Sequence, residues 1–178
     1  MSQFFNGLDL AGFWEPSEYA TAEYIGPEPT PSLIKDSENE LGYKLPASYI
    51  ALMQSQNGGL PFNTCFPTQE STSWAENHVA ITGLLGIGRD KRYSLCGEFG
   101  SRFMIEEWGY PDIGVYFGDC PSAGHDMIAL DYRECGKDGE PKVVHVDQEG
   151  DYRITPLADS FELFVMGLAH DSEYEDDD

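Results

Sequence analysis

The stretch between residues 60 and 155 limits the fold most, because its apolar runs are short and are separated by Gly, Pro and Asp. Such runs are typical of antiparallel strands joined by turns, and they exclude a purely helical protein. A single helix is expected within the stretch, at residues 99–108, with Phe103, Met104 and Trp108 on one face. The expected strands cover residues 64–66, 78–81, 83–87, 114–118, 127–132 and 142–147.

Apolar residues at helical spacing lie on both sides of this strand-rich stretch. Ser32 is expected to cap a helix that ends at Gly42, and Pro46 to stand at the start of a second helix that ends at residues 57–59. Pro156 is expected to start the last helix. The prediction is an α+β fold with N-terminal helices, a central and largely antiparallel sheet of about six strands, and a C-terminal helix.

Length and composition indicate one domain with a continuous core. The chain has 178 residues, of which 40% are hydrophobic and 13% aromatic, which is too apolar for a disordered acidic chain. Residues 1–30, which can form a short helix near 17–24 before a run of prolines, are expected to be an extension packed on the domain. Residues 31–170 are expected to form the domain, and 171–178 an acidic, disordered tail.

The charge of the chain points to a basic partner. Ten Lys and Arg stand against 32 Asp and Glu, giving a net charge of −22. Six of the acids lie in residues 171–178, so the rest of the chain keeps −22 + 6, a net of −16. Such a surface repels nucleic acid and anionic membranes and attracts basic proteins. The alternative that the acidity serves only solubility, or a salty habitat, stays open.

The N-terminus and the cysteines predict a cytoplasmic protein. No basic segment precedes the first apolar residues, and no stretch has the length of a membrane span. Cys65, Cys96, Cys120 and Cys135 are widely spaced and are expected to be reduced thiols. A monomer is the default expectation, since nothing in the sequence sets the oligomeric state.

No nucleotide, cofactor or metal site is predicted from motif spacing. Gly83, Gly86 and Gly88 lie between strand-like segments and lack the dinucleotide-binding spacing, so they are interpreted as turn glycines. The four Cys and four His show neither C-x-x-C nor H-x-x-x-H spacing. His145 is interpreted as a hydrogen-bonded residue of a strand.

The best arrangement for nucleophilic catalysis is Cys120 with His125 and either Asp126 or Asp131. A nucleophilic cysteine needs a lowered pKa and an oriented base. The surrounding acids would raise the pKa of this thiol, and Pro121 and Gly124 predict a turn between strands. The prediction is therefore a protein that is not an enzyme.

A run of acids beside aromatic residues resembles an interface with aromatic anchors and a charged rim. The competing interpretation is that Trp108 and Tyr116 belong to the core and that the acids form a solvated face. The residues predicted to contact a partner are Glu106, Glu107, Trp108, Asp112, Asp119 and Asp126.

Three sequence blocks together resemble the SUKH superfamily, which includes the yeast Smi and Knr cell-wall synthesis regulators and many bacterial proteins. The first is Glu38-x-x-Leu41-Gly42-x-x-Leu45-Pro46-x-x-Tyr49, followed by Asn57-Gly58-Gly59. The second is Gly118-Asp119 followed by Gly124-His125-Asp126 and a strand. The third is Ala158-x-Ser160-Phe161-x-x-Phe164.

The resemblance implies a mixed sheet flanked by helices, without known catalytic residues. Bacterial members serve as immunity proteins that neutralise polymorphic toxins, among which nucleases with basic faces are prominent. It follows that the expected partner is a cognate basic toxin, inhibited by an acidic protein that covers its active face. The alternative is a regulatory or scaffold protein of the Smi and Knr kind that binds several cellular partners.

Overall fold

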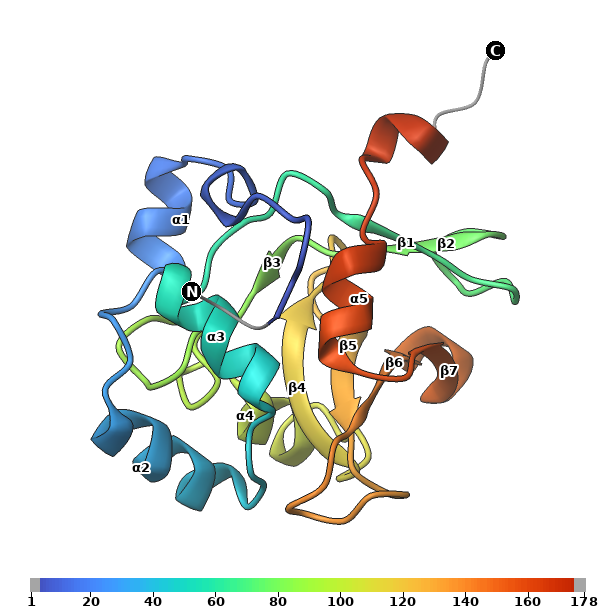
Figure 1. Cartoon of the computed structure of the whole chain (residues 1–178). Coiled ribbons are helices and arrows are strands. Elements are labelled where there is room, and N and C mark those ends of the chain that lie inside the picture. Colours follow the sequence, from blue (N-terminus) through green and yellow to red (C-terminus); the bar gives the residue numbers. More distant parts are fainter. Residues whose placement is uncertain (1–3, 175–178) are drawn as a thin grey trace.

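Helices cover both faces of an antiparallel sheet in the computed structural model, which describes residues 4–174 (Figure 1). The helices are α1 (Glu18–Glu23), α2 (Pro31–Leu41), α3 (Ala47–Ser55), α4 (Ser101–Glu106) and α5 (Phe161–Gly167). The short 3₁₀ turns are η1 (Leu10–Gly12), η2 (Gln148–Gly150) and η3 (Asp171–Tyr174). The strands are β1 (Cys65–Pro67), β2 (His78–Ala80), β3 (Gly83–Leu84), β4 (Gly114–Asp119), β5 (Asp126–Asp131), β6 (Lys142–Asp147) and β7 (Arg153–Ala158).

The strands form two antiparallel sheets, which confirms the predicted α+β class. The larger sheet has the order β3-β4-β5-β6-β7, so each strand pairs with its neighbour in sequence. β1 and β2 form a separate two-stranded sheet. The described residues therefore hold seven strands, slightly more than the predicted six.

Alternation along β4 divides the core between the two faces of the larger sheet. Phe117 faces α3 and α5, with its ring 5.8 Å from that of Tyr49 and 5.3 Å from that of Phe161. Tyr116 points to the other face, where it belongs to a second apolar cluster with Met104 of α4. In Figure 1, α3 and α5 lie in front of β4 and β5, and α4 lies behind them.

The prediction that Pro156 starts the last helix is wrong, because Pro156 lies in β7, paired with Val144. β7 is the edge of the sheet, where a proline without an N–H group can be accommodated, and the register shifts between Val143 and Val144. The helix begins instead at Phe161, and the Ser160 side chain caps it.

Other element boundaries differ from the prediction for local reasons. Thr30, not Ser32, caps α2, because its side chain accepts the hydrogen bond from the Leu33 N–H, and Pro31 takes the first helical position. The strand expected at residues 83–87 ends at Leu84. Leu85 N still donates to Phe117 O of β4, but from Gly86 onward the backbone pairs with a loop, since Leu95 N donates to Gly86 O. The helix expected at 99–108 is limited to α4.

Asn57, which the sequence marks only as a turn residue, is a buried connection between three segments. Its Nδ2 donates to the carbonyl oxygens of Pro27 (2.8 Å) and Ile87 (2.9 Å), and its Oδ1 accepts from Ile87 N (2.7 Å). Its own carbonyl accepts from Gly26 N. One side chain therefore joins the N-terminal extension, the end of α3 and the segment after β3.

The described part of the extension packs against the domain. Phe5, Phe13 and Trp14 belong to the main core, and the Tyr24 hydroxyl donates to the Asp119 carboxylate at 2.8 Å. At the other end, residues 171–174 of the predicted disordered tail form η3, and residues 175–178 lie outside the described residues. None of the described helices has both the length and the hydropathy needed to cross a membrane.

Candidate functional site: an aromatic pocket beside an acidic helix end

A pocket of about 230 Å³ opens between α4 and the turn that joins β4 to β5. Three of the acids predicted to contact a partner lie at or shortly after the end of α4, namely Glu106, Glu107 and Asp112. The pocket is lined mainly by aromatic and sulfur-containing side chains, which are Tyr93, Phe99, Phe103, Met104, Trp108, Cys120 and Met127, together with Asp119, Ala123 and Gly124. Concave apolar sites with a few polar groups are the usual form of binding sites.

A chain of ring contacts builds one wall of this pocket. Tyr24 of the extension stacks on Tyr93 with ring centroids 4.6 Å apart. Tyr93 contacts Phe99 at 5.5 Å, and Phe99 contacts Phe103 of α4 at 5.4 Å. The sequence indicated only the Phe103 face of this wall, because the other rings come from loops and from the extension.

Trp108 is held in place from both sides. Its carbonyl oxygen accepts a hydrogen bond from the Tyr152 hydroxyl at 2.5 Å, and its ring packs against Gly124 in the β4–β5 turn. Gly124 has φ = +97°, and a Cβ atom there would lie 3.0 Å from Cζ2 of Trp108. The Tyr110 hydroxyl donates to Gly124 O at 2.6 Å, which fixes the turn against the pocket.

We expect Gly124→Ala to lower the free energy of unfolding by about 2 kcal/mol and to displace the Trp108 ring. Gly136→Ala is the matched control, since Gly136 also has a positive φ (+79°) but nothing lies within 4 Å of its virtual Cβ. Urea unfolding measures both losses, and near-ultraviolet circular dichroism follows the indole. Equal losses in the two variants, with an unchanged indole signal, would contradict the packing described.

Asp119 supplies the ionisable group of the pocket wall. Burial raises the pKa of Asp119 to about 7, although the hydrogen bond from Tyr24 opposes this shift. The carboxyl group therefore changes its charge around neutral pH instead of near pH 4. The wall of the pocket gains negative charge as the pH rises through this range.

The acids at and after the end of α4 form the exposed part of the site. Glu106, Glu107 and Asp112 are exposed, and Arg102 lies between two of them, 3.0 Å from Glu106 and 3.4 Å from Asp112. The Tyr43 hydroxyl also donates to Asp112, at 3.4 Å. One arginine against three carboxylates leaves an acidic surface.

Asp126 does not belong to this surface. The sequence predicts it as a contact residue, but its carboxylate is buried, 2.7 Å from Nε2 of His145, and also accepts a hydrogen bond from the Ser122 hydroxyl. It lies at the start of β5, where alternation turns it to the α3 and α5 face. The structure thus brings Trp108 and Asp119 together in the pocket, but encloses Asp126 elsewhere.

The arrangement of Cys120 does not resemble that of a catalytic cysteine. Its thiol is buried, and burial together with the carboxylates of Asp126 and Asp119 raises the thiol pKa well above its ordinary value. The His125 ring is exposed and pairs with Gln148 (3.0 Å) and Glu149 (3.1 Å). A nucleophile needs the opposite, a lowered pKa and a hydrogen-bonded base.

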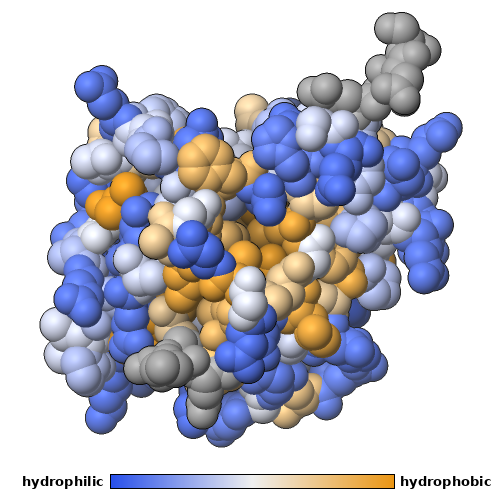
Figure 2. Space-filling view, turned by 45° about the horizontal axis from the view of Figure 1, so that its top comes forward, coloured by the Kyte–Doolittle hydropathy of each residue, from blue (hydrophilic) through white to orange (hydrophobic). Residues whose placement is uncertain are grey.

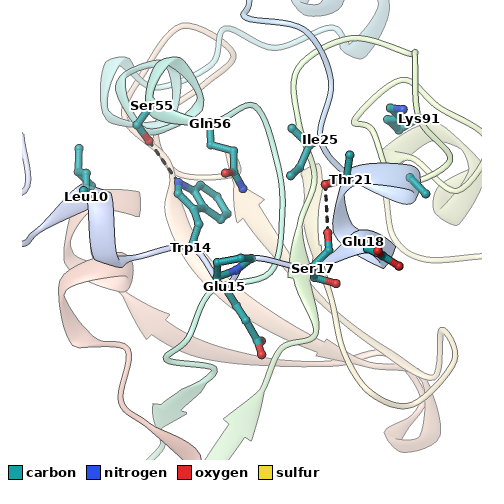
Figure 3. A pocket seen from close by; sticks show the side chains of 13 residues that line it. Leu10, Trp14, Glu15, Ser17, Glu18, Thr21, Ile25, Ser55, Gln56 and Lys91 are labelled. Atoms are coloured by element: carbon teal, nitrogen blue, oxygen red, sulfur yellow. Dashed lines mark hydrogen bonds between the residues drawn. The ribbon is translucent and has the colours of Figure 1, made fainter.

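A larger cavity, of about 870 Å³, lies between the extension and α3 (Figure 3). Figure 3 shows the Trp14 ring on the extension facing Ser55 and Gln56. Trp14 Nε1 donates to Ser55 Oγ at 3.3 Å, which anchors this wall. Because residues 10–25 form most of its lining, this cavity depends on the extension.

Comparison with known proteins identifies the family. No curated protein matches the chain significantly. A family model described as SUKH_6, SMI1-KNR4 cell-wall, matches residues 31–165 and so covers most of the chain, including α4 and the turn beside the pocket. The chain therefore belongs to the SMI1-KNR4 family within the SUKH superfamily.

Proposed function

We propose that this protein is a non-catalytic inhibitor of a basic protein toxin, that is, an immunity protein that covers the active face of its cognate toxin. The observation that carries the proposal is an aromatic pocket next to exposed acids in a SUKH chain of net charge −22. A nuclease toxin fits this surface best, because its active face is basic and binds phosphates.

Charge on the rest of the chain supports the same proposal. The acids outnumber the basic residues by 32 − 10, a surplus of 22. Six of the ten basic residues already pair with acids within the chain, namely Arg89, Arg92, Arg102, Arg133, Lys142 and Arg153. The surplus acids give a field of one sign, which accelerates association with a basic partner at low salt. The pocket supplies a place for a desolvated anchor, which a charged surface alone does not.

The proposal is tested with the product of the gene adjacent to this chain's gene, which the proposal expects to be a secreted toxin. Trp108→Ala is expected to weaken binding at least about 30-fold, the effect of removing an interface anchor of about 2 kcal/mol. The triple reversal Glu106→Lys, Glu107→Lys and Asp112→Lys is expected to slow association and to reduce its salt dependence. Surface plasmon resonance at two salt concentrations measures both.

A second triple reversal serves as the control, at the exposed acids Asp36, Glu76 and Asp138, which changes the net charge equally. Equal effects of the two triple variants would mean that only net charge matters and would overturn the proposed contact surface. An adjacent gene product that does not bind at all would overturn the immunity function. The alternative, a scaffold, predicts several partners that all dissociate at high salt.

A different contact face is an additional outcome of the same test. Figure 2 shows apolar surface gathered in the middle of one face, inside a border of hydrophilic surface. α5 carries two exposed large apolar side chains, Leu163 (55% exposed) and Met166 (42%). If Leu163→Ser abolishes toxin binding and Trp108→Ala does not, the toxin binds through α5 instead of the pocket.

A further inference from the structure

Three side chains that can bind a metal ion converge at one end of the larger sheet. Cys120, Asp126 and His145 place their ligand atoms within 4.8 Å of one another. All three side chains are buried, with exposures of 3%, 2% and 0%. They come from the residue after β4, the start of β5 and the middle of β6, so their spacing in the sequence gives no sign of the cluster.

Hydrogen bonding in the cluster is incomplete. Nε2 of His145 is 2.7 Å from Asp126, but the other ring nitrogen, Nδ1, has no partner among the described residues. Thr155 lies opposite His145 in the β6–β7 register, and its buried hydroxyl likewise has none. A buried polar atom without a hydrogen bond lowers the stability of the fold. Two such atoms on neighbouring strands therefore indicate that the site also adopts a state in which they are hydrogen-bonded.

No lysine or arginine among the described residues compensates the charge around the cluster. Asp126 and its cross-strand neighbour Asp147 are both buried, and within the described residues neither has a Lys or Arg nitrogen within 4.0 Å. Asp147 is stabilised by hydrogen bonds from Ser73, from its N–H (2.9 Å) and its hydroxyl (2.6 Å). Buried carboxylates usually pair with a cation or coordinate a metal.

We propose that Cys120 Sγ, the Asp126 carboxylate and His145 Nε2 bind a divalent cation of the zinc class. Thiolate, imidazole and carboxylate are the ligands of Zn²⁺, and three protein ligands leave a fourth position for water. The ion would enter from the side of Asp126, which is the one of the three ligands that lines a neighbouring cavity of about 330 Å³.

For Asp126 and His145 the geometry requires only a small movement, while Cys120 Sγ lies within 4.8 Å of both. Two ligands of a tetrahedral zinc ion lie roughly 3.3 Å apart, given bonds of about 2.0–2.1 Å. Asp126 and His145 are now 2.7 Å apart across a shared hydrogen, which the ion would replace. The two side chains therefore need to separate by about half an ångström, within the range of side-chain rotation.

Metal binding would displace two protons in the cluster, one from the nitrogen of His145 that binds the ion and one from the Cys120 thiol. Coordination by Nε2 of His145 leaves the ring proton on Nδ1, which has no hydrogen-bond partner among the described residues. Thr155, the cross-strand neighbour in β7, would have to turn its hydroxyl toward Nδ1 to accept that proton. The Cys120 thiol gives its proton to solvent as the thiolate binds the ion. Binding therefore releases about one proton per ion to the solvent.

A bound ion would fix the β4–β5 turn, since Cys120 and Asp126 stand on either side of it. The same turn carries Gly124 against Trp108, so the ion would stabilise the aromatic pocket without lying in it. The site is independent of the proposed toxin partner, and each can fail without the other.

The test is titration of the metal-free full-length chain with Co²⁺ and Zn²⁺, in excess Mg²⁺ to saturate weak sites on the acidic surface. A thiolate-to-Co²⁺ charge-transfer absorption at one ion per chain, displaced by Zn²⁺, is expected. Cys120→Ser should remove this absorption and weaken Zn²⁺ binding by more than about 100-fold. His145→Gln should weaken binding similarly.

Cys65→Ser and His125→Gln are the matched controls. Cys65 is a second buried cysteine, and His125 is a neighbouring histidine outside the cluster. Both variants should bind Zn²⁺ and Co²⁺ as the unaltered chain does. Zn²⁺ should also raise the melting temperature of the unaltered chain but not that of Cys120→Ser. The Cys120→Ser substitution is conservative, so this variant should fold and allow the test even if His145→Gln does not fold. Absence of the thiolate absorption, or an unchanged affinity in Cys120→Ser, would overturn the site.

Discussion

Replacing Asn57 with alanine is expected to lower the free energy of unfolding by about 3–4 kcal/mol. The change leaves Ile87 N–H and the carbonyl oxygens of Pro27 and Ile87 without their side-chain partner. Each buried polar group left unpaired costs about 1–3 kcal/mol. Urea denaturation followed by circular dichroism measures the loss.

The same variant should loosen the N-terminal extension before it unfolds the domain. The Asn57 side chain donates the hydrogen bond that holds the Pro27 carbonyl. Limited proteolysis should therefore cut near residues 20–30 faster in Asn57→Ala than in the unaltered chain. Asn39→Ala is the matched control, because Asn39 is exposed on α2 and its loss should change stability by less than about 0.5 kcal/mol. A loss below about 1 kcal/mol in Asn57→Ala would show that the side chain does not connect these segments.

The second large effect concerns pH. The Asp119 carboxyl has a folded-state pKa of about 7, above its ordinary value of 3.8, because burial disfavours its charged form. Between these two values the folded chain holds a proton that the unfolded chain has released. The contribution of Asp119 is therefore fully present at low pH, falls as the pH rises from about 4 to about 7, and stays lost above that.

Asp119→Asn is expected to remove this dependence and to be more stable than the unaltered chain at pH 8 by about 2–4 kcal/mol, since one pKa unit corresponds to about 1.4 kcal/mol. The amide oxygen can still accept the hydrogen bond from Tyr24. Asp36→Asn, at an exposed position of α2, controls for the loss of one negative charge. Parallel pH profiles for the unaltered chain and Asp119→Asn would contradict the raised pKa.

The pH dependence bears on the proposed binding surface as well. Asp119 lines the aromatic pocket, so ionisation there changes the charge that a bound group meets. A basic anchor from a partner would favour the ionised form. Binding of the proposed toxin partner should then tighten between pH 6 and pH 8, and Asp119→Asn should bind it independently of pH over this range.

The sequence by itself determined the helices at the two ends of the chain, most of the antiparallel strands and the family. These features depend on local signals, namely caps, turn residues and the period of apolar positions, which act over a few residues. Asn57-Gly58-Gly59 was recognisable as a turn for this reason. The prediction for Pro156 was wrong because a proline can either start a helix or lie in an edge strand. Only the pairing of β7 with β6 distinguishes the two positions.

Only the tertiary structure decided which polar and aromatic side chains meet. The register of β4, β5 and β6 turns Asp126 inward to His145, away from the surface where the sequence placed it. The extension brings Tyr24 to Asp119 across 95 residues of chain. Such contacts depend on how the strands pair and on which distant segments pack together. Neither produces a periodic sequence pattern, so the sequence cannot show which of 32 acids and ten tyrosines take part.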